Sequence, residues 1–248
     1  MPEGPSIVIL KEAVEPFKGK TVIGVSGNRK IDLQRISGKK VLDFLSFGKQ
    51  FLIRFDGFAI RIHLLLFGTY LINEQKETAP RLSLVFKNGE LNFYGCSVLF
   101  VEEELDAVYD WSADIMSDAW DPKAAKMKLK NRPSMMVCDA LLSQDIFAGV
   151  GNIIKNEVLY RVKVHPETVV GNLPEGKLDD MVREARIYSF EFLEWKKRYE
   201  LKKHWLAHTK KTCIRCDLPL TKMYLGKTNR RSFFCNNCQI NYSGFQED

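Results

Sequence analysis

Four of the six cysteines in this 248-residue chain form two C-x2-C pairs near its C-terminus. The pairs are Cys213/Cys216 and Cys235/Cys238, with eighteen residues between them. Each pair lets two thiolates of one turn reach the same tetrahedral ion, and four thiolates leave no coordination position for a substrate. The spacing therefore predicts one structural zinc ion in a ribbon or finger. The other two cysteines stand alone in apolar stretches, which favours buried thiols over disulfides.

A second group with chemical potential is the N-terminus, where Pro2 and Glu3 directly follow Met1. Removal of Met1 would expose proline as a free secondary amine, and an α-amino group titrates near pH ~8, well below a lysine near ~10. Such an amine can attack an aldehydic sugar carbon, and a neighbouring carboxyl group can protonate a leaving group. Pro2 and Glu3 are equally typical of a helix start, where proline and acidic residues are favoured. These two residues alone favour the helix start.

The charge of the chain is unevenly distributed, although its net charge is only +6. Residues 102–121 contain eight acids and no Lys or Arg, whereas residues 196–231 contain twelve Lys or Arg and two acids. This asymmetry suggests a polyanionic partner for the C-terminal part. A solvated basic helix face explains the same charges equally well.

The elements that must position these groups change character along the chain. Apolar spacing predicts a helix over residues 5–16. Seven strand-like runs then follow to about residue 101, with hairpin turns at Asp56-Gly57 and Asn88-Gly89, so a sandwich or barrel is expected. From residue 122 the pattern is helical. The acidic residues between the two regions are the candidate linker.

Membrane insertion and secretion are not expected. No apolar run approaches the 18 or so residues that cross a bilayer. The first residues, MPEGPSIVILKEAVEPF, lack the basic region and small-residue cleavage site of a secretory signal. We therefore expect a soluble intracellular protein, cytoplasmic or associated with the nucleoid.

Four separated motifs together resemble the formamidopyrimidine-DNA glycosylase/endonuclease VIII family, in that family's order. They are MPEGP at the start, FGKQ at 47–50, LLSQDIFAGVGNIIKNEVLYRVKVHP at 141–166, and the terminal CIRC…RRSFFCNNCQ. The resemblance covers essentially the whole chain. It implies an α+β multidomain fold with an N-terminal helix and β-sandwich or barrel, a helical domain with a helix–two-turns–helix element, and a four-cysteine zinc finger. The domains expected are a catalytic domain (1–105), an acidic linker (106–121), a helical domain (122–205) and a zinc finger (206–248).

The resemblance also assigns roles to single residues. Pro2 matches the family's Schiff-base nucleophile, Glu3 its acid/base partner, and Lys49 the lysine that contacts phosphate and assists the chemistry. Asn152 matches an asparagine that binds backbone phosphate, and Arg230 the finger arginine that grips the phosphates beside the flipped nucleotide. Without the family motifs, Lys49 would be an ordinary hairpin lysine and Asn152 a helix N-cap.

Two assignments leave alternatives open. Arg231 is adjacent to Arg230, so Arg231 is the alternative candidate for the phosphate-binding arginine. HLLLFG at 63–68 aligns with the loop that fills the void left by the flipped nucleotide, which makes Leu65, Leu66 and Phe67 the candidates. The same apolar run could equally be core. It also departs from the family, where the loop is more polar or carries methionine.

The function implied is base-excision repair by a glycosylase with AP lyase activity, acting as a monomer on damaged DNA with no cofactor beyond structural Zn²⁺. The segment before the finger has no Gly-rich loop like the one with which the family's 8-oxoguanine branch covers its lesion. Together with PEGP and the Gly-Lys turn, this makes the chain resemble the endonuclease VIII branch more closely and implies oxidised pyrimidines as the lesions. Ser6 occupies a position where many members of the family have glutamate. Three alternatives stay open: an 8-oxoguanine/formamidopyrimidine-preferring enzyme, an inactive lesion-binding protein, and a zinc-ribbon module with a protein or RNA partner.

Overall fold

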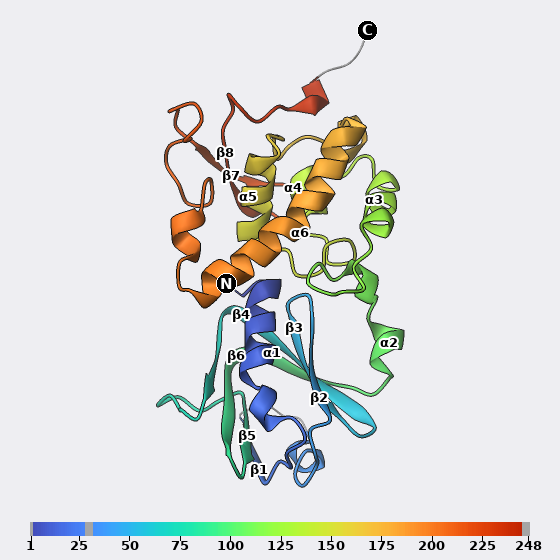
Figure 1. Cartoon of the computed structure of the whole chain (residues 1–248), viewed down its shortest axis with the longest axis vertical. Coiled ribbons are helices and arrows are strands. Elements are labelled where there is room, and N and C mark those ends of the chain that lie inside the picture. Colours follow the sequence, from blue (N-terminus) through green and yellow to red (C-terminus); the bar gives the residue numbers. More distant parts are fainter. Residues whose placement is uncertain (1, 28–31, 245–248) are drawn as a thin grey trace. The chain divides into compact units, whose positions relative to one another are not determined.

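The computed structural model describes residues 2–27 and 32–244, and the chain divides into two compact units, Met1–Asp110 and Trp111–Asp248. Figure 1 labels their elements. Unit 1 contains α1 (Gly4–Ala13), β1 (Gly24–Ser26), β2 (Asp43–Phe47), β3 (Gln50–Phe55), β4 (Phe58–Ile72), β5 (Leu82–Phe86), β6 (Gly89–Val101) and α2 (Leu105–Val108). Unit 2 contains α3 (Pro122–Lys130), α4 (Val137–Ala140), α5 (Asn152–Arg161), α6 (Glu175–Lys197), β7 (Thr221–Leu225) and β8 (Arg230–Phe234). Short 3-10 turns occur at Glu15–Phe17, Leu33–Arg35, Trp111–Ala113, Val170–Asn172, Leu201–His204 (η5) and Tyr242–Gly244.

The sheet of unit 1 is antiparallel, with the strand order β1-β5-β6-β4-β3-β2. The seven runs predicted from sequence become six strands in the described part of the chain. Four of those runs merge into the long strands β4 and β6, because each pair continues across a bend without a turn. β1 was not foreseen, since its three residues are too few to show alternation.

The two ends of this sheet approach each other. The segments beside β1 and β2 meet in an antiparallel bridge between Thr21 and Lys40, and Val41 and Lys20 are joined by a backbone hydrogen bond. The resulting curved sheet encloses an apolar core to which α1 contributes Ile7, Leu10 and Val14. The predicted closed or sandwich-like β-domain with an N-terminal helix is confirmed.

The hairpin turns differ slightly from their predictions. Asp56-Gly57 joins β3 to β4 as expected, and Gly57 has a φ of 80°, which favours glycine. The second predicted turn is wrong by one residue. Phe86 pairs with Gly89, so the turn is Lys87-Asn88 and Gly89 begins β6.

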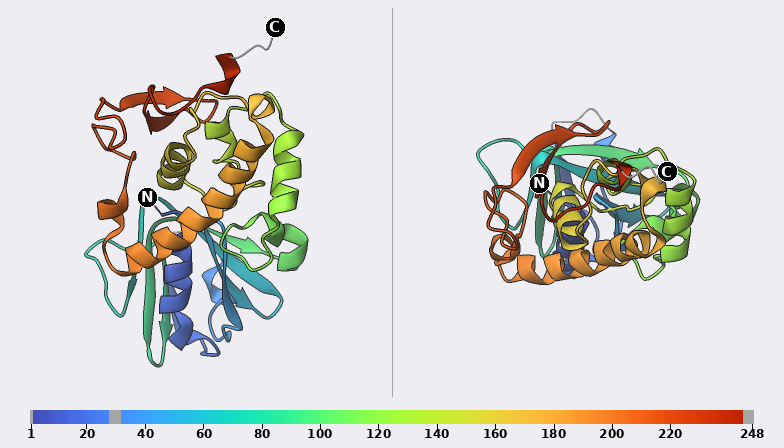
Figure 2. Two further views of the ribbon diagram at one scale, coloured as in Figure 1. Left: turned by 45° about the horizontal axis from the view of Figure 1, so that its top comes forward. Right: turned by 90° about the horizontal axis from the view of Figure 1, so that it is seen from above.

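The helices of unit 2 surround one apolar core, and α5 and α6 pack against each other (Figure 2). The long α6 turns one face inward at helical spacing, with Leu178, Met181, Val182, Ala185, Tyr188 and Phe192 buried. The boundary between the units falls inside the acidic segment. Its later residues are packed rather than extended, since Ala113 and Ile115 are buried in unit 2. The further division into helical and finger domains stays a proposal.

Candidate functional site

The N-terminal end of the chain forms the cap of α1. Glu3 is the N-cap residue: its side chain accepts the backbone N–H of Ser6, and the Ser6 hydroxyl accepts the N–H of Glu3 at 3.4 Å. This capping box satisfies two backbone donors at the helix start. Glu3 is buried, and Pro2 immediately precedes it. Glu3 therefore has a structural role at the helix start, as the sequence allowed, while catalytic roles for Pro2 and Glu3 stay predictions. Met1 lies outside the described residues.

Lys49 lies in the two-residue turn of the β2–β3 hairpin, as predicted. Phe47 pairs with Gln50, and Gly48 has a φ of 53°. Because this value lies in the left-handed region, glycine removes the steric cost that another residue would meet there. Lys49 is thus presented by a turn whose geometry depends on the residue before it.

Sequence reasoning missed a group of polar side chains around this turn. His63 on β4 pairs with Gln50. Burial, followed by the charge of Lys49, lowers the pKa of His63. The Tyr109 hydroxyl donates to Gln50 Oε1 at 2.9 Å, and burial raises the pKa of Tyr109. His63 and Arg61 alternate with the buried Ile60 and Ile62. Position 63, as a polar residue inside an apolar run, was the signal available in the sequence.

The predicted void-filling residues are exposed. On β4 the pairing moves from Leu64 opposite Cys96 to Thr69 opposite Tyr94, so residues 65–68 bulge out of the sheet. The exposed fractions are 51% for Leu65, 54% for Leu66 and 86% for Phe67. The alternative that this run is core is therefore wrong. The DNA role of the loop stays a prediction.

Two glycines hold this bulge. A Cβ on Gly68 would lie 2.7 Å from the carbonyl oxygen of Gly95, and Gly95 itself has a φ of 57°. The two backbones therefore approach more closely than any residue with a side chain would permit. This contact separates the exposed loop from the regular strand on either side of it.

In unit 2, Asn152 is the first residue of α5, and Gly151 is the N-cap. The alternative that Asn152 is an N-cap is therefore wrong. Its side-chain amide donates instead to the carbonyl oxygen of Arg231 at 2.9 Å, and its Oδ1 is buried with no hydrogen-bond partner among the described residues. Asn152 thus joins α5 to the β7–β8 hairpin. Phosphate binding by Asn152 stays a prediction.

Two further α5 residues form hydrogen bonds with strand β8. The Lys155 ammonium donates to the Ser232 hydroxyl at 2.8 Å and to the Arg231 carbonyl at 3.3 Å. Asn156 accepts the backbone N–H of Phe233 at 3.2 Å. Lys155 is almost completely buried, so these polar partners offset part of its desolvation. Strand β8 is consequently fixed to α5 through its backbone.

The two adjacent arginines of β8 have different surroundings. The Arg231 guanidinium donates to the Tyr224 hydroxyl at 2.7 Å across the hairpin. Arg230 is exposed, and no residue in the described ranges forms an ion pair or side-chain hydrogen bond with it. Both arginines are exposed, but only Arg231 has a side-chain hydrogen bond within the described residues, so phosphate binding by Arg230 stays the prediction with Arg231 as its alternative.

The turn of this hairpin is held by Asp139 of α4. The Asp139 carboxylate accepts the backbone N–H of Lys227 at 2.8 Å and that of Thr228 at 3.1 Å, together with the Thr228 hydroxyl at 2.7 Å. Gly226 has a φ of 71°, and a Cβ there would lie 2.4 Å from an Asp139 oxygen. Only glycine fits this contact.

The four cysteines of unit 2 come together, as their spacing predicted. Their Sγ atoms all lie within 4.8 Å of one another. The Cys213–Cys216 and Cys213–Cys238 distances are 3.6 Å and Cys216–Cys235 is 3.7 Å. Tetrahedral zinc with Zn–S bonds of about 2.3 Å requires S···S distances of about 3.8 Å, so the site fits that ion. The Tyr160 hydroxyl contacts Cys213 Sγ at 3.1 Å.

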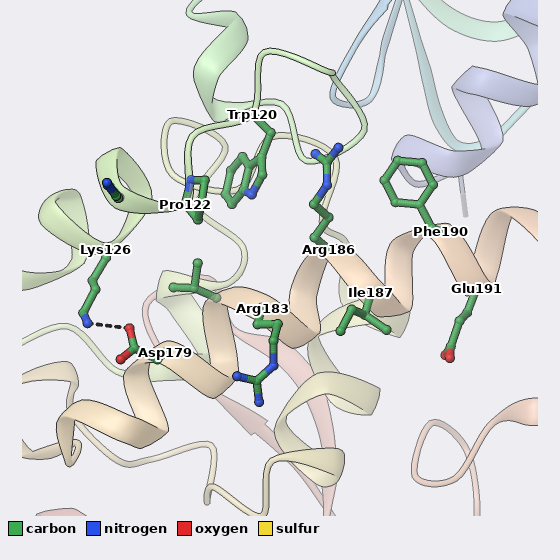
Figure 3. Close-up of a pocket in the computed structure, with 11 residues that line it drawn as sticks. Trp120, Pro122, Lys126, Asp179, Arg183, Arg186, Ile187, Phe190 and Glu191 are labelled. Atoms are coloured by element: carbon green, nitrogen blue, oxygen red, sulfur yellow. Dashed lines mark hydrogen bonds and ion pairs between the residues drawn. The ribbon is translucent and has the colours of Figure 1, made fainter.

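An apolar groove of unit 2 has no predicted site residue in its lining. It has a volume of about 1060 Å³ and lies between α3 and α6. Figure 3 shows Trp120, Ile187 and Phe190 around it, and an ion pair between Lys126 and Asp179 at one end. The candidate chemistry therefore resides elsewhere.

Within the described residues, none of the helices has both the length and the apolar character required to cross a membrane.

Comparison with known proteins identifies two domains. Residues 1–96 match the formamidopyrimidine-DNA glycosylase N-terminal domain, and residues 112–188 match the formamidopyrimidine-DNA glycosylase H2TH domain. The mouse (Mus musculus) endonuclease 8-like 3 is 30% identical over 77% of this chain and 33% of its own length. The DNA-(apurinic or apyrimidinic site) lyase Nei2 of Mycolicibacterium smegmatis is 29% identical over 71% of this chain and 72% of its own length. The chain thus spans about a third of the first of these relatives.

Solved structures agree with this fold. The formamidopyrimidine-DNA glycosylase of Lactococcus lactis, bound non-covalently to DNA containing an AP site, has a TM-score of 0.83 and 20% identity, covering 96% of this chain and 99% of its own. A viral DNA glycosylase has the same TM-score and identity, covering 96% of this chain and 100% of its own.

Proposed function

The chain belongs to the formamidopyrimidine-DNA glycosylase/endonuclease VIII family, and on that premise we propose that it excises oxidised bases from DNA and then cuts the strand at the resulting abasic site. One observation carries the proposal. Pro2 directly precedes the capped start of α1, with the carboxyl group of Glu3 on the next residue. Once Met1 is removed, this end offers a secondary amine that is partly unprotonated at neutral pH.

In the proposed reaction the Pro2 nitrogen attacks C1′ of the damaged nucleotide, and the bond from C1′ to the base breaks. The base leaves with a proton, and the sugar ring opens to an iminium ion. Loss of a C2′ proton then expels the phosphate on C3′, and a second elimination expels the phosphate on C5′. Water releases Pro2 from the sugar fragment. The products are a free base and a one-nucleotide gap.

Glu3 and Lys49 assist these steps in the proposal. A carboxyl group beside the amine can protonate the ring oxygen or the departing base, which is general acid catalysis. Lys49, presented by its tight turn, contacts a phosphate next to the lesion and offsets charge that develops during elimination. Neither role requires a group from outside the chain.

Phosphates farther from the lesion are held by unit 2. Arg230 supplies an exposed guanidinium, which suits phosphate oxygens. Asn152 lies at the start of α5, where the positive end of the helix dipole favours anions. Lys or Arg contacts to phosphate position DNA without reading its sequence, and their number sets the salt dependence of binding.

The exposed loop of Leu65, Leu66 and Phe67 fills the gap left in the duplex when the damaged nucleotide leaves the stack. Removing a nucleotide costs a few kcal/mol, and apolar wedges commonly occupy the space. The exposure of all three side chains in a bulge supports this role, because apolar residues in the middle of a strand would otherwise be expected to pack into the core.

Oxidised pyrimidines are the proposed lesions. The segment between α6 and the first cysteine contains no Gly-rich loop. It is tied down instead, because the buried Glu157 carboxylate accepts the backbone N–H groups of Leu206, Ala207 and His208 at 2.7 to 3.0 Å. A fixed segment of this kind is unsuited to covering a bulky purine lesion. The alternative is a preference for 8-oxoguanine or formamidopyrimidine.

Zinc is the proposed ion of the four-cysteine cluster, held by Cys213, Cys216, Cys235 and Cys238. With four thiolate ligands it stabilises the ribbon and leaves no open position for a substrate. The reaction proposed above uses no step at the metal.

Borohydride trapping tests the function directly. Reduction of the iminium ion should leave a covalent protein–DNA adduct with wild-type protein on duplex DNA carrying an oxidised pyrimidine, and no adduct with Pro2→Gly. Mass spectrometry of the same sample should find Met1 absent. Binding to damaged duplex without any adduct would instead identify a lesion-binding protein that lacks the chemistry. A panel of single defined lesions, oxidised pyrimidines against 8-oxoguanine, tests the substrate class.

A further inference from the structure

An aromatic side chain stands almost fully exposed just beyond α6. Tyr199 has an exposed fraction of 96%, the largest of any exposed large hydrophobic residue in the described chain. Apolar surface of this size is normally packed or partly covered by neighbours, because its exposure to water is unfavourable. The position of Tyr199 therefore calls for a physical reason.

Backbone geometry shows that this exposure is built into the helix end. Tyr199 has a φ of 59°, and the N–H groups of Tyr199 and Glu200 donate to the carbonyl groups of Lys196 and Trp195. This pattern is a Schellman motif, whose left-handed position is usually occupied by glycine. A tyrosine there costs conformational energy that glycine would avoid. Tyrosine therefore occupies this position at a conformational cost.

The end of α6 before Tyr199 is joined to η5 after it. The rings of Trp195 and His204 stack with their centroids 4.2 Å apart and an interplanar angle of 6°, which ties η5 back to α6. Arg161 lies 5.7 Å from the centroid of the Trp195 ring and pairs with Glu184 and Glu191. Tyr199 therefore lies in the short connection between α6 and η5, and the Trp195–His204 stack joins the two ends of this connection.

The segment around Tyr199 has an excess of cations, although Arg198 is paired with Glu194 at 3.7 Å. The segment 196–203, KKRYELKK, has five cations and one acid. Glu200 is paired with Lys203 at 3.0 Å, whereas Lys202 is exposed and no described residue forms an ion pair with it. An exposed aromatic ring among cations is the arrangement by which proteins bind single-stranded nucleic acid, since the ring stacks on a base and the cations contact phosphates.

We infer that Tyr199 is a stacking platform for an unpaired base of the DNA, outside the lesion site, with Lys202 on an adjacent phosphate. Inside a duplex both faces of a base are covered by its neighbours, so the occupant is a base in a single-stranded flank or at a strand end. This inference rests on the proposed function only in assuming that the ligand of this basic segment is DNA. In Figures 1 and 2, η5 lies on the same side of unit 2 as the loops that lead into β7.

The test uses the full-length protein and a duplex with a single-stranded overhang that carries one 2-aminopurine. Stacking on Tyr199 should quench the fluorescence of this base. Tyr199→Gly should abolish the quenching and weaken binding of the overhang DNA by about tenfold, a typical effect for one stacked base. Tyr199→Phe should retain both. Because glycine suits the left-handed position, Tyr199→Gly should fold with an equal or higher Tm.

Thr209→Gly is the matched control. Thr209 is also exposed and has a φ of 63°, but it carries neither a ring nor a charge. This variant should leave quenching and affinity unchanged. Lys202→Gln should lower the slope of log Kd against log salt by about 0.7, as expected for one phosphate contact on a single strand.

Two results separate this inference from the proposed function. Borohydride trapping on a blunt lesion-bearing duplex should be equal for wild type and Tyr199→Gly. If the wild type formed no adduct, the proposed function would be rejected, whereas the inference about Tyr199 would be unaffected. Wild-type quenching and affinity in Tyr199→Gly on the overhang DNA would overturn the platform whatever the trapping result.

Discussion

The candidate residues of the two units are positioned in different ways. In unit 1 the catalytic candidates are positioned locally, because Glu3 is fixed by Ser6, three residues away, and Lys49 by a two-residue turn. The exposed loop at 65–67 is the exception, since it depends on the Gly68–Gly95 contact between two strands. In unit 2 it is long-range, because Asn152 reaches Arg231 over 79 residues and Asp139 reaches Thr228 over 89. Local positioning depends on propensity and capping, whereas long-range positioning depends on the packed unit. Substitution of Glu3 should therefore act mainly on chemistry, whereas changes that disturb the contacts of β8 in unit 2 should act mainly on DNA binding.

The largest effect is expected at Glu3. Glu3→Gln keeps an oxygen that can accept the Ser6 N–H but loses the acid, so base excision should fall by about 10³-fold, within the range for general acid catalysis. Cutting at pre-formed abasic sites should persist, and the two activities are measured on separate oligonucleotides. Ser6→Ala is the control, since it removes only the capping hydroxyl and should cost about 1 kcal/mol of stability with excision retained. Equal loss of excision and cutting in Glu3→Gln would contradict the leaving-group role.

Removal of the proposed zinc ion should sharpen the contrast between the units. Chelation should unfold the ribbon, because metal binding by four thiolates supplies its folding free energy. DNA affinity should fall by about 100-fold, because strand β8, which carries Arg230, unfolds and several phosphate contacts are lost together. The near-ultraviolet circular dichroism of unit 1 aromatic residues should be retained. Full DNA affinity in chelated, metal-free protein would show that the ribbon does not contact DNA.

A smaller change isolates the hairpin turn without touching the metal site. Gly226→Ala introduces a Cβ against the Asp139 carboxylate and a strained φ, so the turn must shift and DNA affinity should fall by about tenfold. Zinc content, measured by atomic absorption, should be unchanged. Gly57→Ala is the matched control in unit 1, because its φ is 80° but a Cβ there meets nothing within 4 Å. It should cost about 1 kcal/mol of stability with DNA affinity unchanged.

The smallest expected effect is a pH dependence of unit 2. Burial, and then the charge of Lys155, lower the pKa of His208 to about 4. The neutral ring lies 3.0 Å from the Asn156 amide nitrogen, and protonation would set two donors against each other. A lowered folded pKa means that stability is fully present above the unfolded value near ~6.5 and is lost as the pH falls through about 4. Urea unfolding should lose about 2 kcal/mol over this interval, and less in His208→Gln. An identical pH profile for the two proteins would contradict this assignment.

Much of the candidate site was predictable because its signals are local. The cysteine spacing predicts the cluster, the Gly-Lys pair predicts the Lys49 turn, and both are found. The apolar run at 65–67 was ambiguous, because three consecutive apolar residues fit a core strand and an exposed loop equally well. Its exposure depends on the Gly68–Gly95 contact between two strands, which no local pattern encodes.

The sequence alone therefore determined the α+β class, the four-cysteine cluster and the family, since periodicity, turn residues and ligand spacing act over a few positions. Tertiary structure decided that Arg231 bonds to Tyr224, that Asn152 bonds to the backbone of β8, and that Tyr199 stands exposed. The physical reason is that these outcomes depend on which backbone groups α5 and α6 meet after packing. Such partners lie many residues away along the chain and are chosen only when the core has formed.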